Sequence, residues 1–281
     1  MDRKIETSVK GYQTEDGAGV KLVRVLGRKT VKHFDPLLML DSFDSTNPED
    51  YKAGFPLHPH RGIETVSYLS SGAMTHKDSL GNEDTITDGE IQWMTAGLGI
   101  MHSEMLPASD RLLGVQLWLN LPAKDKMTKP YYKAIKKEEV QEIEIEGGKL
   151  KLLAGAYKNY RGYQAQYLPF DYYDIQIEKG STIRLETEMD QSISLFTLVG
   201  DIRIAGEIIE EKTALHLTQG DRVTIEALSD QVQVLYMGSE RLDEPVAWDG
   251  PIVMNTDEEL REASLDLANG TFIRDELDFN A

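Results

Sequence analysis

The sequence predicts an all-β protein that contains two related β-domains. Short segments rich in Val, Ile, Thr and Tyr recur along the chain, separated by Gly, Asp and Asn, as in residues 64–69, 114–119, 192–198 and 231–236. Segments of this kind and spacing are typical of an antiparallel sandwich or barrel. A weak internal repeat adds the second half of the prediction, because it indicates that one β-domain has been duplicated.

Two short matches carry the internal repeat. Residues 64–72 (ETVSYLSSG) resemble residues 192–200 (SISLFTLVG), and residues 86–91 (ITDGEI) resemble residues 217–223 (LTQGDRV). Each matched segment combines strand-forming residues with a Gly. We therefore expect the two halves of the chain to share one fold.

The boundary between the halves is predicted where the strand pattern stops. Residues 122–137 contain Pro130 and six Lys, a composition that favours a connecting segment. We expect an N-terminal domain over residues 1–134 and a C-terminal domain over residues 135–281.

One short helix is predicted near the C-terminus. Thr256 and Glu259 have the spacing of a capping box, in which each side chain bonds a backbone N–H of the first turn. An apolar stripe at residues 260, 263 and 267 follows, and Gly270 marks the end of the helix. This pattern favours a helix that covers one sheet.

Composition excludes several classes of function. The 281 residues include no Cys, which rules out disulfides, thiolate nucleophiles and iron–sulfur ligation. The net charge of −18 disfavours direct binding to nucleic acid or to an anionic membrane surface. The charged N-terminal segment lacks the apolar core of a secretory signal, and no apolar run is long enough to cross a bilayer. We therefore expect a cytoplasmic protein.

Two pairs of side chains have the spacing of metal ligands. His58 and His60 are two residues apart, as are His102 and Glu104. Residues two apart on a strand point to the same side, so two neighbouring strands could bring all four groups around one point. Imidazole and carboxylate suit Fe, Mn, Co, Ni, Cu or Zn, and four protein ligands leave coordination positions open. The alternatives are hydrogen-bonded histidine pairs or a closed structural zinc.

The motifs around these residues resemble the pirin family. Residues 54–68 (GFPLHPHRGIETVSY) and 92–105 (QWMTAGLGIMHSEM) are similar to its two longest signatures. Shorter matches span nearly the whole chain in order: residues 35–41 (DPLLMLD), 116–122 (QLWLNLP) and 250–256 (GPIVMNT).

This resemblance implies both a fold and a site. Pirins are bicupins, so each half would be a cupin domain (a double-stranded β-helix, or jelly roll). His58, His60, His102 and Glu104 would ligate one divalent transition metal, usually iron. Some bacterial pirins are quercetin 2,3-dioxygenases, whereas vertebrate pirins are nuclear co-regulators whose iron state matters.

Glu64 is the alternative carboxylate ligand. Cupins more broadly use a Glu a few residues after the His-x-His pair, and Glu64 has this spacing, whereas the pirin pattern favours Glu104. His76 is interpreted as a structural residue, with a role as a hydrogen-bond partner of a metal ligand as the alternative, and Gln116 is a candidate for orienting a ligand. No substrate-binding residues are assigned.

The second half is expected to lack the metal ligands. Aligning Gly72 with Gly200 places Glu186 and Glu188 opposite the His58–His60 pair. Aligning Gly89 with Gly220 places Gln233 and Leu235 opposite His102 and Glu104. Leu cannot coordinate a metal, so the C-terminal cupin would be metal-free.

The resemblance thus favours a metal-dependent dioxygenase that cleaves a flavonol such as quercetin, with dioxygen as co-substrate and Glu104 as general base. The alternative is a metal-containing regulatory or redox-sensing module that binds a protein partner without turnover. A different metal-dependent enzyme on the same scaffold is the third hypothesis, because fold alone does not determine chemistry.

Overall fold

The computed structural model describes residues 1–274, which form two compact units. The N-terminal unit comprises Gln13–Leu22, Leu37–Lys136 and, of the described residues, those from Leu242 to Arg274. The C-terminal unit comprises Met1–Tyr12, Val23–Pro36 and Lys137–Arg241. The chain therefore changes unit at residues 136–137, close to the expected boundary.

The units differ from the expected contiguous halves because each contains a terminal segment of the chain. Strand β1 (Ile5–Lys10) pairs antiparallel with β22 (Thr213–Leu217), which assigns the first residues to the C-terminal unit. The last segment belongs to the N-terminal unit, where Arg61 forms a parallel bridge with Ile252. Backbone pairing with a distant strand, rather than position in the sequence, therefore determines the unit to which each terminal segment belongs.

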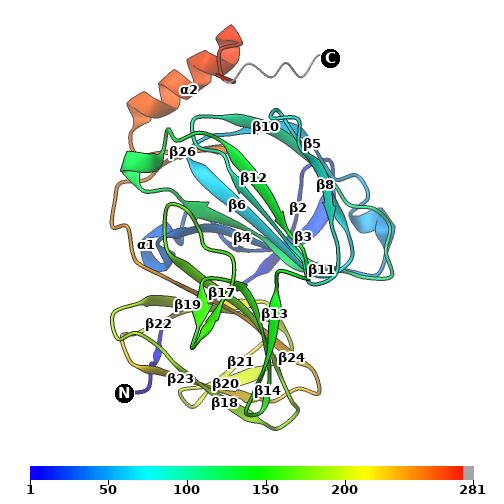
Figure 1. Ribbon diagram of the computed structural model, residues 1–281, viewed down its shortest axis with the longest axis vertical. Coiled ribbons are helices and arrows are strands. Elements are labelled where there is room, and N and C mark those ends of the chain that lie inside the picture. The colour runs from blue at the N-terminus through cyan, green and yellow to red at the C-terminus, as the bar shows by residue number, and fades with distance from the viewer. Residues whose placement is uncertain (275–281) are drawn as a thin grey trace. The chain divides into compact units, whose positions relative to one another are not determined.

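The N-terminal unit consists of a larger and a smaller antiparallel sheet, whose strands can be followed in Figure 1. In spatial order, the larger sheet contains β12 (Tyr131–Ile135), β9 (Ile91–Thr95), β6 (Ile63–Ser71), β11 (Leu112–Asn120), β4 (Leu37–Ser45), β3 (Val20–Leu26) and β2 (Tyr12–Asp16). The smaller sheet contains β5 (Phe55–His60), β10 (Ile100–Met105), β7 (Met74–Asp78) and β8 (Glu83–Ile86).

The C-terminal unit repeats this arrangement. Its larger sheet contains β1, β22, β19 (Ser192–Val199), β24 (Val232–Ser239), β17 (Phe170–Ile177), β14 (Gly148–Ala154) and β13 (Gln141–Ile145). Its smaller sheet contains β18 (Thr182–Glu186), β23 (Arg222–Ala227), β20 (Ile202–Ile204) and β21 (Glu207–Ile209). The two strand orders match at every position except one edge of the larger sheets, where β12 follows the other strands of its sheet in sequence and β1 precedes those of its own. Strands β5 and β10 therefore correspond to β18 and β23. This correspondence is what a duplicated β-domain predicts.

The remaining elements are short, apart from one helix. They are α1 (Val31–Phe34), the 3-10 turns η1 (Pro48–Asp50) and η2 (Ala123–Asp125), and the hairpins β15 (Ala156–Tyr157) with β16 (Tyr160–Arg161) and β25 (Ala247–Asp249) with β26 (Ile252–Met254).

The predicted C-terminal helix is confirmed as α2 (Asp257–Asn269). Thr256 and Glu259 form the full capping box, and Gly270 ends the helix with φ of 70°. Ala263 of this helix packs in a small apolar cluster with Met254 and Phe272. Neither helix in residues 1–274 has the length and apolar character needed to cross a membrane.

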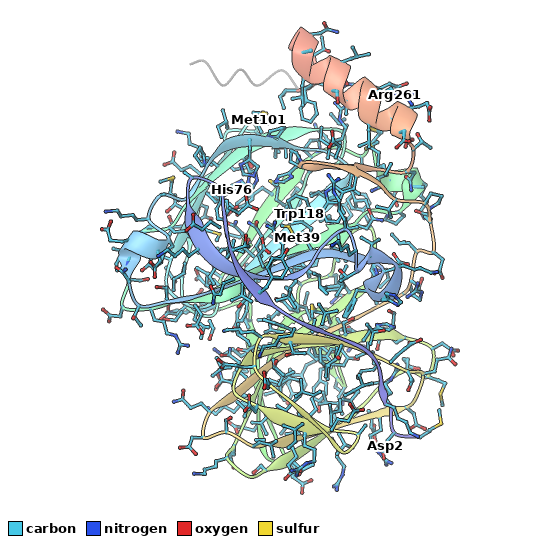
Figure 2. All side chains as sticks on the ribbon, turned by 180° about the vertical axis from the view of Figure 1, so that it is seen from behind. Asp2, Met39, His76, Met101, Trp118 and Arg261 are labelled. Atoms are coloured by element: carbon cyan, nitrogen blue, oxygen red, sulfur yellow. The ribbon has the colours of Figure 1, made fainter. Side chains whose placement is uncertain are left out.

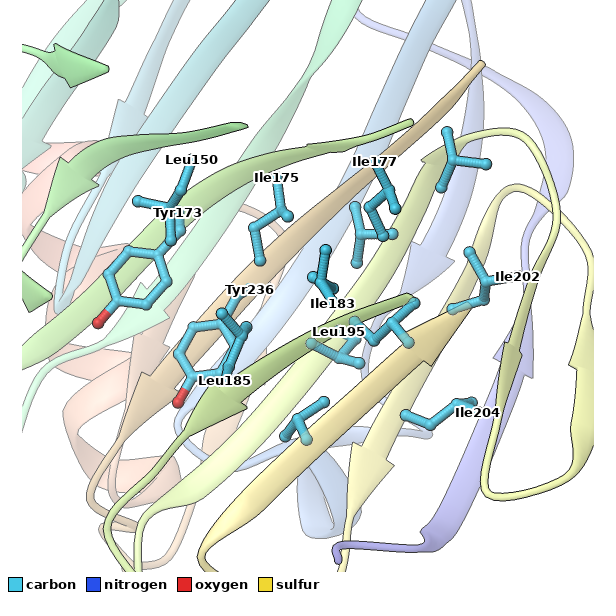
Figure 3. Close-up of a cluster of buried hydrophobic side chains, with 14 of the residues drawn as sticks. Leu150, Tyr173, Ile175, Ile177, Ile183, Leu185, Leu195, Ile202, Ile204 and Tyr236 are labelled. Carbon is cyan, nitrogen blue, oxygen red and sulfur yellow. The ribbon is translucent and has the colours of Figure 1, made fainter. Parts of the chain in front are cut away.

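In the C-terminal unit, the two strands that correspond to β5 and β10 contribute aliphatic side chains to the core. Ile183 and Leu185 of β18, and Val223 and Ile225 of β23, are all buried in one apolar cluster. Figure 3 shows Ile183 and Leu185 among the side chains of this cluster. The strands that correspond to β5 and β10 therefore contribute aliphatic side chains to a core, which leaves no donor atoms for a metal at these positions.

The sequence alignment of the second half was partly wrong. Gly89 precedes β9, whereas Gly220 follows β22 and precedes β23, so these two glycines are not equivalent. The strand that corresponds to β10 is β23, and Gln233 and Leu235 lie on β24 instead. The error arose because a strand-plus-Gly pattern recurs at every turn and does not define which turn it marks.

Candidate metal centre

Three imidazole rings meet on two neighbouring strands of the N-terminal unit. His58 and His60 lie on β5, and His102 on β10 is paired directly opposite His58. Nε2 of His58 lies 3.0 Å from Nε2 of His60 and 3.0 Å from Nε2 of His102. The three residues form a group whose ligand atoms are close enough to hold one metal ion. The His-x-His spacing thus places both rings on one side of the strand.

The hydrogen bonds on the far side of two of these rings define their tautomers. Nδ1 of His58 lies 2.8 Å from the carbonyl oxygen of Pro56, and Nδ1 of His60 lies 2.9 Å from that of Pro251. A carbonyl oxygen can only accept, so each Nδ1 carries the proton and donates it. Each Nε2 then presents a lone pair to the centre of the cluster, as a metal-ligating histidine does.

A metal cation fits the centre of this arrangement. Two lone pairs 3.0 Å apart repel one another unless a positive charge lies between them. Burial lowers the pKa of His60 to about 3 and the pKa of His102 well below its ordinary value, so these two rings are neutral near neutral pH. A transition-metal ion between the rings would accept their lone pairs.

The segment that supplies Pro251 is held against the end of β5. The backbone N–H of Val253 donates to the carbonyl oxygen of Arg61 at 3.1 Å. Gly62 has φ of 79°, and a Cβ at this position would lie 2.0 Å from the carbonyl oxygen of Val253, so only Gly permits the approach. Buried Lys126 donates to the carbonyl oxygens of both Gly62 and Val253. A segment remote in sequence thus fixes one ring of the cluster.

The carboxylate of Glu104 is oriented by two amides. Nε2 of Gln92 donates to Oε1, and Nε2 of Gln116 donates to Oε2 at 2.6 Å. Glu104 is buried and belongs to a second metal-capable group, with His102 and His76, and not to the group formed by the three clustered rings. Gln116, a candidate for orienting a ligand, thus orients this carboxylate. Gln92 was missed because a lone Gln in a strand has no distinguishing pattern.

Glu64 belongs to neither metal-capable group among the described residues. It lies three residues before Ser67 on β6, and therefore on the opposite face of the strand, while Ser67 contacts both Gln92 and Gln116. On one continuous strand, His60 and Glu64 would lie on the same face, because they are four residues apart. Gly62 separates β5 from β6, so the two residues lie on different strands. Burial raises the pKa of Glu64 to about 7, and its Oε1 accepts a 2.6 Å hydrogen bond from Thr95.

Aromatic side chains flank the cluster. The ring of Trp118 meets that of His60 edge-on at 4.9 Å, and Trp248 of β25 lies 5.7 Å from Trp118. Trp118, a residue of β11, is labelled within the N-terminal unit in Figure 2. The buried indole ring of Trp118 lowers the local polarity around the imidazoles, which strengthens charge interactions at the cluster.

These features define a class of protein. Two double-sheet β-units of matching topology, one with converging imidazoles on its smaller sheet, are those of a two-domain cupin that could hold one metal ion.

Comparison with known proteins gives the family. The model of the Pirin domain matches residues 19–119, and that of the Pirin C-terminal cupin domain matches residues 172–273. A pirin-like protein from Caulobacter vibrioides is 40% identical over 96% of this chain and 99% of its own length. Pirin from Homo sapiens is 34% identical over 95% of this chain and 93% of its own. The chain belongs to the pirin family.

A solved structure agrees with this assignment. The crystal structure of quercetin 2,3-dioxygenase from Acinetobacter baumannii is similar with a TM-score of 0.89 and 30% sequence identity. The similarity covers 97% of this chain and 99% of that protein. The bicupin fold expected from the sequence is therefore confirmed.

Proposed function

We propose that this pirin is a metal-dependent dioxygenase that cleaves flavonols such as quercetin. The observation that supports the proposal most strongly is the convergence of imidazole lone pairs from His58, His60 and His102 beside the carboxylate of Glu104. The similarity to the quercetin 2,3-dioxygenase from Acinetobacter baumannii supports the choice of reaction. Three imidazoles and one carboxylate are a donor set that suits dioxygen-using metals.

The metal would be held by His58, His60 and His102, which form one metal-capable group. Glu104 is proposed as the fourth ligand, from the neighbouring group that shares His102. Fe(II) is the metal that we propose, and Mn, Ni, Co, Cu and Zn are accepted by the same donors. When bound, the metal supplies Lewis acidity toward the substrate and redox chemistry toward dioxygen. The protein's own contribution is to hold the rings in one tautomer and in one place.

Glu104 is proposed to take the proton of the flavonol 3-hydroxyl group, which makes the substrate electron-rich. Gln92 and Gln116 each donate one hydrogen bond to a different carboxylate oxygen. A carboxylate has about four acceptor positions, so Glu104 keeps the capacity to accept the substrate's proton. The two amides thereby orient the base while leaving it available.

The test is aerobic loss of quercetin by the purified protein after reconstitution with Fe(II). Glu104→Gln keeps the shape of the side chain and removes the base, so we expect turnover to fall by about 100-fold or more. His33→Ala, which changes an exposed histidine of the C-terminal unit, is the matched control and should retain wild-type turnover. Full metal loading without any quercetin loss would contradict the proposal and favour a regulatory role.

A further inference from the structure

A fourth imidazole extends the cluster beyond the residues that the metal centre requires. His76 lies on β7, which pairs with β10 on the side away from β5. Its side chain is fully buried, and its Nδ1 lies 3.4 Å from Nδ1 of His102. Figure 2 shows His76 within the N-terminal unit. The ring is stacked on that of Tyr132, with centroids 4.1 Å apart and 7° between the planes.

The tautomer of His76 is determined by Asp78. Nε2 of His76 lies 2.8 Å from Oδ2 of Asp78. The carboxylate also accepts from the backbone N–H groups of Leu80 and Asn82, at 2.9 and 3.1 Å, and from the side-chain amide of Asn82. Both oxygens of Asp78 thus already accept N–H donors, Oδ1 from Leu80 and Asn82 and Oδ2 from Asn82. The carboxylate acts as an acceptor toward His76 as well, so Nε2 of His76 carries the proton and Nδ1 presents a lone pair.

This lone pair faces Nδ1 of His102, the third ring of the metal cluster. A hydrogen bond between two nitrogens requires that one of them donates. Because Nδ1 of His76 carries no proton, Nδ1 of His102 must be the donor. We infer that His76 is a positioning residue: it accepts the Nδ1 proton of His102 and thereby keeps the Nε2 lone pair of His102 directed toward His58. Two hydrogen bonds then link the three residues: Nε2 of His76 donates to Asp78, and Nδ1 of His102 donates to Nδ1 of His76.

The consequence is a preformed third ligand. A histidine with no partner favours the tautomer that carries its proton on Nε2, which would point a proton at the metal site. Outer partners of metal-bound histidines typically change metal affinity by 10- to 100-fold. The role of His76 concerns how the chain binds a metal, so it holds whether or not the reaction is flavonol cleavage.

The direct test is histidine-selective 15N NMR of the full-length, metal-free protein. Long-range 15N–1H correlations distinguish a protonated ring nitrogen from an unprotonated one. We expect His102 to carry its proton on Nδ1 and His76 to carry its proton on Nε2. A wild-type spectrum in which His102 is protonated on Nε2 would overturn the inference, and this measurement does not depend on any variant folding.

Three variants separate the hydrogen bond from packing. His76→Leu removes the acceptor, and we expect the Zn(II) dissociation constant, measured by competition with a chelator, to rise by about 10- to 100-fold. His76→Asn retains an acceptor oxygen near the place of Nδ1 and should recover most of this loss. Tyr132→Phe keeps the stacked ring and should leave Zn(II) affinity and the His102 tautomer unchanged. Equal affinity in the Leu and Asn variants would contradict the inference.

Discussion

Nε2 of His102 faces Nε2 of His58 at 3.0 Å across the paired strands β10 and β5. This relationship links the fold to its chemistry, because an antiparallel pair brings opposite residues to the same side of a sheet. His60, two residues further along β5, completes the group. In the C-terminal unit, the corresponding strands contribute buried aliphatic side chains at this place. The duplicated fold thus carries a group of imidazoles that could hold a metal ion in one unit and an apolar core in the other.

The identity of the carboxylate ligand can be tested with two matched variants. Glu104→Gln should lower metal affinity by about 10-fold or more, because it removes a charged donor beside His102. Glu64→Gln should leave metal affinity unchanged, because Glu64 lies on the opposite face of β6 from Ser67. Isothermal titration with Zn(II) compares the two. Loss of affinity in Glu64→Gln alone would reverse the assignment.

Glu64 should also produce a pH dependence of stability. Burial raises its pKa from 4.5 to about 7, so the folded state holds this proton more tightly than the unfolded state does. The resulting stabilisation is complete below about pH 4.5 and is lost as pH rises through about 7, with a total change on the order of 3 kcal/mol. Urea unfolding of metal-free protein at pH 5 and pH 8 measures it.

The Glu64→Gln variant isolates this contribution. Gln does not titrate, so the stability of the variant relative to wild type should increase between pH 5 and pH 8, while effects of other groups cancel in the difference. A constant difference across this range would show that Glu64 titrates normally in the folded protein.

Lys126 should be needed to hold the segment that positions His60. Its Nζ donates to the carbonyl oxygens of Gly62 and Val253 and to Oδ1 of Asn120. Lys126→Met fills a similar volume but leaves these buried acceptors unsatisfied, so we expect a loss of about 2–3 kcal/mol in the free energy of unfolding. Zn(II) affinity should fall as well, because the Pro251 carbonyl oxygen is no longer fixed. Lys124→Met, at a nearby exposed position, is the control, and equal stability of the two variants would contradict this role.

Local patterns were sufficient to predict much of the fold. Short strand segments gave the all-β class, and the capping box of Thr256 and Glu259 gave helix α2 almost residue by residue. Both signals depend on interactions within a few residues, so the linear sequence contains them. The pairing of β1 with β22 could not be predicted in this way, because partners more than 200 residues apart leave no local mark.

The candidate site likewise combines residues that a local pattern predicts with contacts that only the fold reveals. The spacing of His58, His60 and His102 predicted the group that the structure brings together. The hydrogen bond from His60 to Pro251, by contrast, joins residues 191 positions apart. For His76 the sequence favoured a structural role over a role beside the metal ligands, because its neighbour on β10 is apparent only from the pairing of β7 with β10. Candidate ligands in a short motif can thus be predicted, whereas their outer partners require the fold.

The measurement that tests the central claim most directly is metal content by elemental analysis after reconstitution with Fe(II). We expect about one metal per chain in the wild-type protein and in the His33→Ala control, since one group of three imidazoles holds one ion. His58→Ala, His60→Ala and His102→Ala should each lose most of the metal while their far-ultraviolet circular dichroism spectra remain those of the folded protein. Metal at wild-type stoichiometry in all three variants, or its absence from the reconstituted wild type, would contradict the account.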